Sequence, residues 1–78
     1  MPVLYLTEQG SALKKVGETL VVEKDGTRLA ELECHRLEAV LIFGNVQITT
    51  QAMAALLQHG IETAFLHFHE VYLSLLDP

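Results

Sequence analysis

The sequence has few of the residues with which small chains commonly cross-link a core or bind nucleic acid. Its 78 residues include one cysteine, no tryptophan and five basic residues against ten acidic ones. A lone Cys34 cannot form an internal disulfide, and it rules out zinc frameworks of the Cys₄ or Cys₂His₂ type. The formal net charge of −5 argues against this chain alone gripping a phosphate backbone, because nonspecific binding to nucleic acid needs clustered basic side chains.

Long apolar runs are missing as well. The uncharged apolar stretches are far shorter than the roughly 20 residues of a membrane span, and Met1-Pro2 opens no secretory signal. We therefore expect a soluble, cytoplasmic protein that makes no membrane contact. Residues 1–78 are expected to form a single domain, and a domain of this size buries only about 60% of its unfolded surface. Because 50% of the residues are hydrophobic, some of them are expected to face a partner.

The centre of the chain, residues 39–66, reads as strand, turn, strand, helix, strand. Five apolar residues from Ala39 to Phe43, ended by the turn Gly44-Asn45, predict a strand buried on both faces. Val46 and Ile48 alternate with polar residues and predict a short half-exposed strand. The extended pattern resumes at residues 61–66.

Between these strands the hydrophobic period changes to that of a helix. Thr49 or Thr50 can cap its start, and Gly60 supplies a left-handed stop. The apolar face is expected to comprise Ala52, Met53, Leu56 and Leu57. This stripe predicts a helix that covers one face of a sheet.

The flanking segments predict further strands. Residues 3–6, 12–16 and 19–23 are short apolar stretches, and Asp25-Gly26 is the strongest hairpin signal because both residues tolerate positive φ. Lys14 and Lys15 suggest an exposed edge, and residues 67–76 alternate as one more strand. The predicted fold is α+β and predominantly antiparallel, a small sandwich or roll of about seven or eight strands with one short helix packed on it.

Few residues suggest chemistry. His67 and His69 are two apart on an expected strand, so they would share a face as two metal ligands do, although Glu70 would point away as a third. Glu31, Glu33 and Glu38 resemble paired carboxylates but are more simply a charged surface near a hairpin. Cys34 and His35 are adjacent, which in a strand would separate them onto opposite faces. No catalytic, cofactor-binding or metal-binding residue is predicted from these patterns.

Several stretches resemble the N-terminal β-rich domain of the CRISPR-associated integrase, the universal subunit of spacer acquisition. They are residues 4–10 (LYLTEQG), 20–22 (LVV) before the Asp-Gly turn, 40–50 (VLIFGNVQITT), 56–57 (LL) and 59–61 (HGI). The resemblance covers nearly the whole chain. Two departures are Glu70 and Ser74, where the family usually has glycines in its last hairpin, and Glu33, where a proline is common.

The resemblance implies a function that the residues alone do not show. In the family, this β domain pairs two integrase subunits as a homodimer, which works with a small ferredoxin-like partner protein on double-stranded DNA. Metal-dependent cutting and strand transfer, expected to use Mg²⁺ or Mn²⁺, belong to a separate helical domain whose Glu, His and Asp have no counterpart here. We therefore expect an assembly domain without catalysis of its own. The alternative is a stand-alone metal-dependent nuclease that uses His67 and His69.

Overall fold

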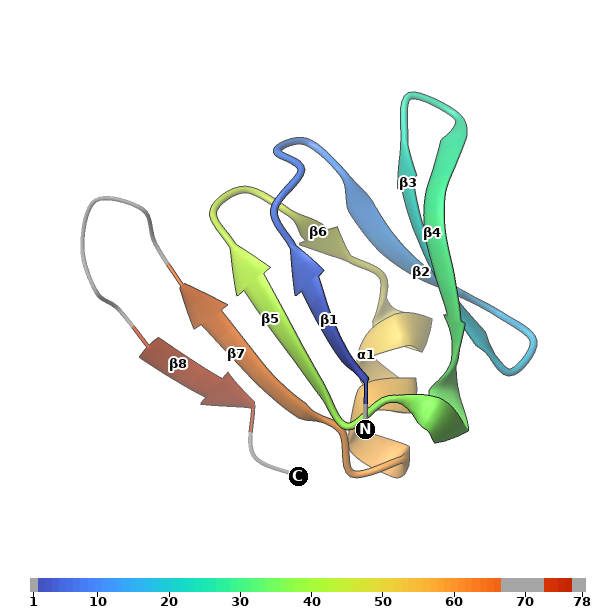
Figure 1. The fold of residues 1–78 in the computed structure, drawn as a ribbon, viewed down its shortest axis with the longest axis vertical. Helices are drawn as coiled ribbons and strands as arrows, with labels where there is room; N and C mark the ends of the chain where they lie inside the picture. Colours follow the sequence, from blue (N-terminus) through green and yellow to red (C-terminus); the bar gives the residue numbers. More distant parts are fainter. Residues whose placement is uncertain (1, 67–72, 77–78) are drawn as a thin grey trace.

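The computed structural model describes residues 2–66 and 73–76. These parts of the chain form eight strands, one α-helix and one 3₁₀ turn (Figure 1). In chain order the elements are β1 (Val3–Leu6), β2 (Ala12–Val16), β3 (Thr19–Lys24), β4 (Thr27–Glu33), the 3₁₀ turn η1 (Cys34–Arg36), β5 (Ala39–Phe43), β6 (Gln47–Ile48), α1 (Thr50–Gln58), β7 (Glu62–Leu66) and β8 (Leu73–Leu76).

The strands form two four-stranded sheets, which stand apart at one end in Figure 1. The first sheet has the order β1-β5-β7-β8, and the second has the order β4-β3-β2-β6. This confirms the predicted α+β fold with mostly β content. Both sheets are mixed: β5 is parallel to β1 and β7, and β2 is parallel to β6, while the remaining pairs are antiparallel. The turn after β5 therefore does not close a hairpin but carries the chain from one sheet to the other.

The predicted hairpin between β3 and β4 is present, and its turn has the backbone that the sequence requires. Asp25 and Gly26 have φ values of 51° and 78°, which are both left-handed as in a type I′ turn. Beyond this turn the register shifts, so that Glu23 faces Arg28 but Val22 faces Ala30. Leu29 is thus the extra residue of a β-bulge on β4.

Helix α1 begins and ends where the sequence predicts. The Thr49 hydroxyl accepts a 3.2 Å hydrogen bond from the Ala52 N–H, and Gly60 has φ 63°. The buried side of the helix consists of Ala52, Ala55 and Leu56. The expectation for Leu57 was wrong: its side chain is 38% exposed, because it lies one residue past the stripe that meets the sheets.

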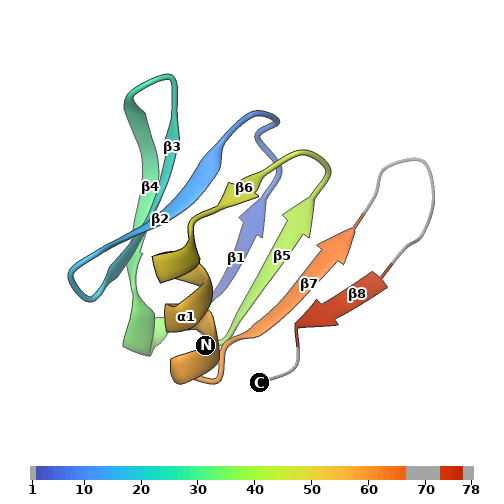
Figure 2. The same ribbon diagram turned by 180° about the vertical axis from the view of Figure 1, so that it is seen from behind.

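The core is formed jointly by both sheets and the helix, as Figure 2 shows with α1 in front of the strands. The prediction that β5 is buried on both faces was too strong. Val40 and Ile42 are buried, whereas Ala39, Leu41 and Phe43 are half-buried. Only one face of the first sheet therefore meets α1 and the second sheet. The buried cluster contains Leu6, Leu13, Leu20, Val22, Cys34, Leu37, Val40, Ile42, Ala52, Ala55, Leu56 and Ile61.

Strand β2 lies between β3 and β6 in the second sheet, but β6 pairs with it only at Ala12 and Leu13. On that side no described strand pairs with Lys14 and Lys15, where an exposed edge was predicted. Lys14 Nζ lies 2.8 Å from Glu23 Oε1 on the neighbouring strand. Because the two lysines are adjacent they point to opposite faces of β2, Lys14 being exposed and Lys15 half-buried.

The predicted last strand is described only in its second half. Residues 73–76 form β8, which pairs antiparallel with residues 63–66 of β7. Residues 67–72 lie outside the described residues. Among the described residues, no helix has the length and apolar character needed to cross a membrane.

Candidate functional site

The carboxylates singled out in the sequence do not converge on a site. Glu31 is exposed and forms a 2.8 Å ion pair with Arg28 on its own strand. The side chain of Glu33 lies 3.7 Å from His35 Nδ1, and Glu38 is exposed on the link into β5. These groups therefore form a solvated surface rather than an acid–base pair.

No metal site is assembled by the parts of the chain that the structure covers, residues 2–66 and 73–76. Within them, no three His, Cys, Asp or Glu side chains lie close enough together to hold an ion. His67 and His69 lie outside the described residues, so the pairing predicted for them stays a prediction. His59 lies at the end of α1 with Nε2 3.8 Å from Glu18 Oε2, where a helix C-terminus favours a cation.

Cys34 is a buried core residue. It lies in η1, not in a strand, and its side chain is fully buried while His35 beside it is exposed. Burial, aided by the charge of Glu18, raises the pKa of the Cys34 thiol. A buried thiol held protonated is a poor nucleophile.

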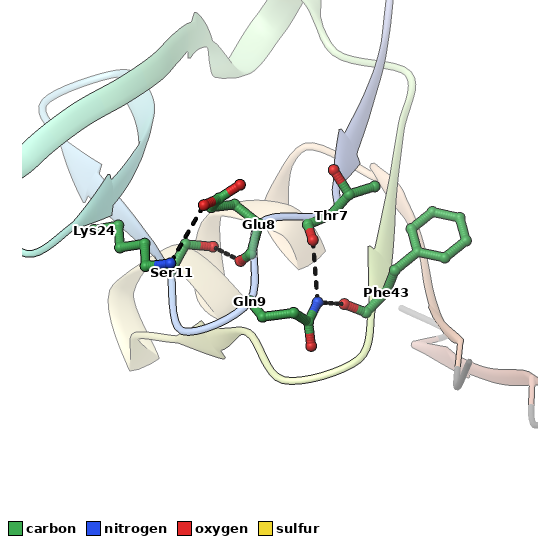
Figure 3. Close-up of polar contacts among 6 residues, drawn as sticks. All are labelled: Thr7, Glu8, Gln9, Ser11, Lys24 and Phe43. Carbon is green, nitrogen blue, oxygen red and sulfur yellow. Dashed lines mark hydrogen bonds and ion pairs between the residues drawn. The ribbon is translucent and has the colours of Figure 1, made fainter. Parts of the chain in front are cut away.

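The most organised polar feature joins the two sheets at one end, and it is built around Gln9 (Figure 3). The Gln9 carboxamide donates to the carbonyl oxygens of Phe43 at 2.7 Å and Thr7 at 3.1 Å. Its oxygen accepts a 2.8 Å hydrogen bond from the Asn45 N–H. The Gly10 N–H completes the contact by donating to the Asn45 carbonyl oxygen at 2.8 Å. We call this set of contacts the Gln9 junction.

The Gln9 side chain takes the place of a missing strand residue. In a parallel ladder, the N–H and the C=O of one residue bond the carbonyl of one residue and the N–H two residues further along the facing strand, and the Gln9 carboxamide bonds Phe43 and Asn45 in this way. The backbone register of β1 and β5 ends with Leu6 opposite Ile42, so residue 8 would come next opposite Gly44. The chain has by then turned toward β2, and the carboxamide continues the ladder in its place.

Neighbouring polar groups hold the same loop. Ser11 is buried, and its hydroxyl donates a 2.7 Å hydrogen bond to the Glu8 carbonyl oxygen. Lys24 Nζ from the end of β3 lies 3.3 Å from the Glu8 carboxylate. The Ser11 carbonyl oxygen in turn accepts from the Gln47 N–H at 3.0 Å. The Ser11 hydroxyl therefore bonds the backbone of its own loop and does not serve as a nucleophile.

The sequence pattern of residues 7–11 gives no indication of this junction. The two stretches that it joins, residues 4–10 and 40–50, are among those that carried the family resemblance. Periodicity gives no sign of it, because the contact joins residues 34 and 36 positions apart.

A shallow apolar groove lies beside the junction, between β1 and the β3–β4 hairpin. Its volume is about 110 Å³, below the roughly 300 Å³ at which ligand pockets begin. Its one carboxylate is that of Glu8, which is paired with Lys24. The groove therefore suits an apolar contact rather than catalysis. Its lining residues are Leu4, Tyr5, Leu6, Thr7, Glu8, Ser11, Val22, Leu29 and Ala30.

Comparison with known proteins identifies the family. The family model described as CRISPR associated protein Cas1 matches residues 4–78. The CRISPR-associated endonuclease Cas1 2 of Rhodospirillum rubrum is 35% identical over 63 residues, which are 81% of this chain and 18% of the relative. The chain thus spans about a fifth of the curated relatives that it matches.

Solved structures share the fold at lower identity. A Cas1 protein from Thermotoga maritima superposes with a TM-score of 0.83 at 23% identity, covering 100% of this chain and 24% of that one. A chain of a partial Cas6-RT-Cas1–Cas2 complex gives a TM-score of 0.91 at 23% identity, covering 99% of this chain and 23% of that one. The sequence matches and the two-sheet architecture agree, and this chain belongs to the Cas1 family of CRISPR-associated proteins, whose N-terminal β-rich domain it resembles.

Proposed function

We propose that this chain is the assembly domain of a Cas1 integrase, which pairs with a second copy of itself and contributes no reacting group. In this proposal the cutting and joining of DNA during spacer insertion belong to the full-length Cas1 protein. The match over residues 4–78 supports the assignment, and the chain's share of about a fifth of its curated relatives leaves ample room for a separate catalytic domain.

The observation that carries this proposal is how the described polar side chains are used. Gln9, Ser11 and Thr49 bind backbone groups of the fold itself. Among the described residues, Glu8, Glu23 and Glu31 pair with neighbouring basic side chains. The exposed acidic residues are Glu18, Asp25, Glu33, Glu38 and Glu62. Acid–base chemistry needs a group whose pKa is shifted toward the working pH by its surroundings, and the described part of the chain supplies no such setting.

Metal dependence is proposed for the full-length protein only. A nuclease of this family would use Mg²⁺ or Mn²⁺, which prefer several carboxylate or other oxygen ligands. The described residues do not fit such an ion, because no three potential ligands come together among them. We therefore derive no step of the reaction through this chain.

Partners follow from the same proposal. One structural neighbour is part of a Cas1–Cas2 complex, and we propose that the full-length protein works with a small ferredoxin-like partner of that kind. Double-stranded DNA would be held elsewhere in the full-length protein, since the net charge of this chain is −5 and phosphates are neutralised by basic side chains. We expect the protein to act in the cytoplasm.

Nuclease assays test the absence of catalysis. The purified chain, incubated with Mg²⁺ or Mn²⁺ and labelled duplex DNA, should produce no cleavage above a buffer control. A double variant, His67→Ala with His69→Ala, should leave the activity of the full-length enzyme unchanged. Cleavage by the chain that disappears in the double variant would establish the alternative, a nuclease built on His67 and His69.

Self-association is tested separately. We expect light scattering to give the mass of a dimer at micromolar concentrations, because apolar side chains such as Tyr5, Leu29 and Leu57 are exposed at 61%, 48% and 38%. A monomer mass at all accessible concentrations would contradict the assembly proposal.

A further inference from the structure

The first sheet has an outer face that is apolar almost throughout. Leu6, Val40 and Ile42 belong to the core, and because side chains alternate along a strand, their neighbours point to the opposite side. This side is turned toward the reader in Figure 1, where α1 lies behind the strands. On β1, β5 and β7 the register arranges these neighbours in three rows, which we call the outer sheet face. The rows are Val3, Ala39 and Glu62; Tyr5, Leu41 and Ala64; and Phe43 with Leu66.

The second sheet differs from the first in the charge of its outer face. One of its outer rows places Lys14 and Glu31 on either side of Val21, and Lys14 forms an ion pair with Glu23. Charges of this kind are typical of an antiparallel sheet with one face in water. The outer sheet face carries a single charge, at Glu62 where β7 begins, although Tyr5 is 61% exposed.

The strand directions of the first sheet favour a cover on both faces. Strands β1, β5 and β7 are parallel to one another. Parallel strands occur almost only in sheets that are covered on both faces, and they read as continuous apolar runs. Residues 3–6 (VLYL) and 39–43 (AVLIF) are such runs. Among the described residues, α1 and the second sheet cover one of the two faces, so the apolar pattern fits a fold with a further cover.

We propose that the outer sheet face binds a helix of the segment that follows residue 78 in the full-length protein. The inference rests on the proposed function, in which this chain is one domain of a longer Cas1 protein. The chain spans about a fifth of its curated relatives, which leaves room for such a segment. A helix is the element that normally covers parallel strands. Its contact side would be an uncharged apolar stripe that packs on Tyr5 and Leu41.

The end of β8 lies close enough for this arrangement. Strand β8 belongs to the same sheet, and Leu76 lies opposite Thr63 on β7. The middle strand β5 is two strand spacings from β8, a distance of about 10 Å. Three or four extended residues span about that distance. A short link therefore brings a helix of about 10 Å diameter onto the face.

The size of the outer sheet face favours a tethered segment over a separate molecule. Three strands of up to five residues present a plane of roughly 14 Å by 16 Å, or about 220 Å². A stable interface between separate molecules buries about 800 Å² on each partner. A segment of the same chain loses far less translational and rotational freedom when it docks, so a small apolar area is enough to hold it.

Hydroxyl-radical footprinting of the full-length protein tests for this cover. In the native protein, Tyr5 should be oxidised at least about tenfold more slowly than in urea, because a docked helix excludes water. Leu29, 48% exposed on β4, is the internal control and should be slowed only in proportion to the exposure it has lost. The protection of Tyr5 should be the same at low and high protein concentration.

Two results of the footprinting would overturn the docked helix. One is a Tyr5 rate slowed no more than that of Leu29. The other is protection that appears only at high concentration, which would assign the face to a second copy. Neither result changes the dimer mass from light scattering, on which the assembly proposal depends.

A charge variant of the full-length protein gives a second measurement. Tyr5→Glu, at an exposed position, should preserve the circular dichroism spectrum, but its carboxylate would be buried without a partner beneath a helix. The amides of the segment after residue 78 should then exchange at least about tenfold faster. Tyr5→Phe and the matched control Leu29→Glu should retain the wild-type rates. Wild-type exchange in Tyr5→Glu would contradict the proposed contact.

Discussion

The carboxamide of Gln9 donates a 2.7 Å hydrogen bond to the carbonyl oxygen of Phe43, 34 residues further along the chain. This bond and its companion from the Asn45 N–H tie the loop after β1 to the loop after β5. Since these loops lead into the second sheet, at β2 and β6, the Gln9 junction fixes how the two sheets begin relative to each other.

Replacing Gln9 by Ala should lower the free energy of unfolding by about 1–2 kcal/mol, because three exposed hydrogen bonds are lost and water replaces them in part. Urea denaturation followed by circular dichroism measures this. Gln47→Ala is a matched control, since the exposed Gln47 side chain makes none of these bonds. Hydrogen exchange adds a local readout: the Asn45 amide should exchange faster in Gln9→Ala, and an unchanged rate would show that the junction does not form in solution.

Thr49→Ala should destabilise the protein by about 1 kcal/mol through loss of the helix cap. Its hydroxyl accepts from the Ala52 N–H at 3.2 Å, whereas Thr50 is exposed one position later. Thermal unfolding should therefore show a lower midpoint for Thr49→Ala than for Thr50→Ala. Thr49→Asp should retain the wild-type midpoint, because a carboxylate also accepts this bond and suits a helix N-terminus.

Gly26→Ala should cost about 1 kcal/mol for a reason that involves no contact. The backbone of Gly26 has φ 78° and no atom lies within 4 Å of an added Cβ, so only the left-handed conformation penalises the methyl group. Chemical denaturation measures the change. If Gly26→Ala were as stable as the wild type, the type I′ turn described for residues 25–26 would be wrong.

The free energy of unfolding at acid pH should depend on Glu23. The hydrogen bond and charge of Lys14 lower the pKa of Glu23, so this carboxylate contributes stability above its unfolded pKa and loses the contribution as the pH falls through the lower folded value. Carbon-detected NMR titration should place the Glu23 midpoint below the ordinary value of a glutamate, and Lys14→Met should raise it. Equal Glu23 midpoints in the wild type and in Lys14→Met would show that Lys14 does not lower the pKa of Glu23.

Local features of this fold could be predicted from the sequence, because each depends on a few neighbouring residues. Periodicity and turn chemistry predict the bounds of β1, β2 and β5, the Asp25-Gly26 turn and a helix cap at Thr49 or Thr50. The family assignment likewise depended on short stretches that could be recognised one after another.

Long-range features could not be predicted in this way. The parallel pairing of β1 with β5, the inner position of β2 and the Gln9 junction depend on contacts between residues far apart in the chain. The lysines of β2 indicate an exposed edge, and nothing in the sequence shows that β6 pairs with Ala12 and Leu13 at the start of the same strand. The exposure of Leu57 depended on which side of α1 faces the sheets. The helical pattern in the sequence leaves the limit of that buried side uncertain by one residue.

The pairing of β1 also bears on the order of synthesis. Within the described residues β1 bonds only to β5, with Val3 opposite Ala39 and Leu6 opposite Ile42. On a ribosome, the leucines and tyrosine of β1 must wait until the fifth strand has emerged, while the local β2–β3–β4 meander can close at once. Of the described strands, β1 is thus synthesised first but is among the last to pair. In that interval its apolar side chains are exposed to chaperones or to misassociation between nascent chains.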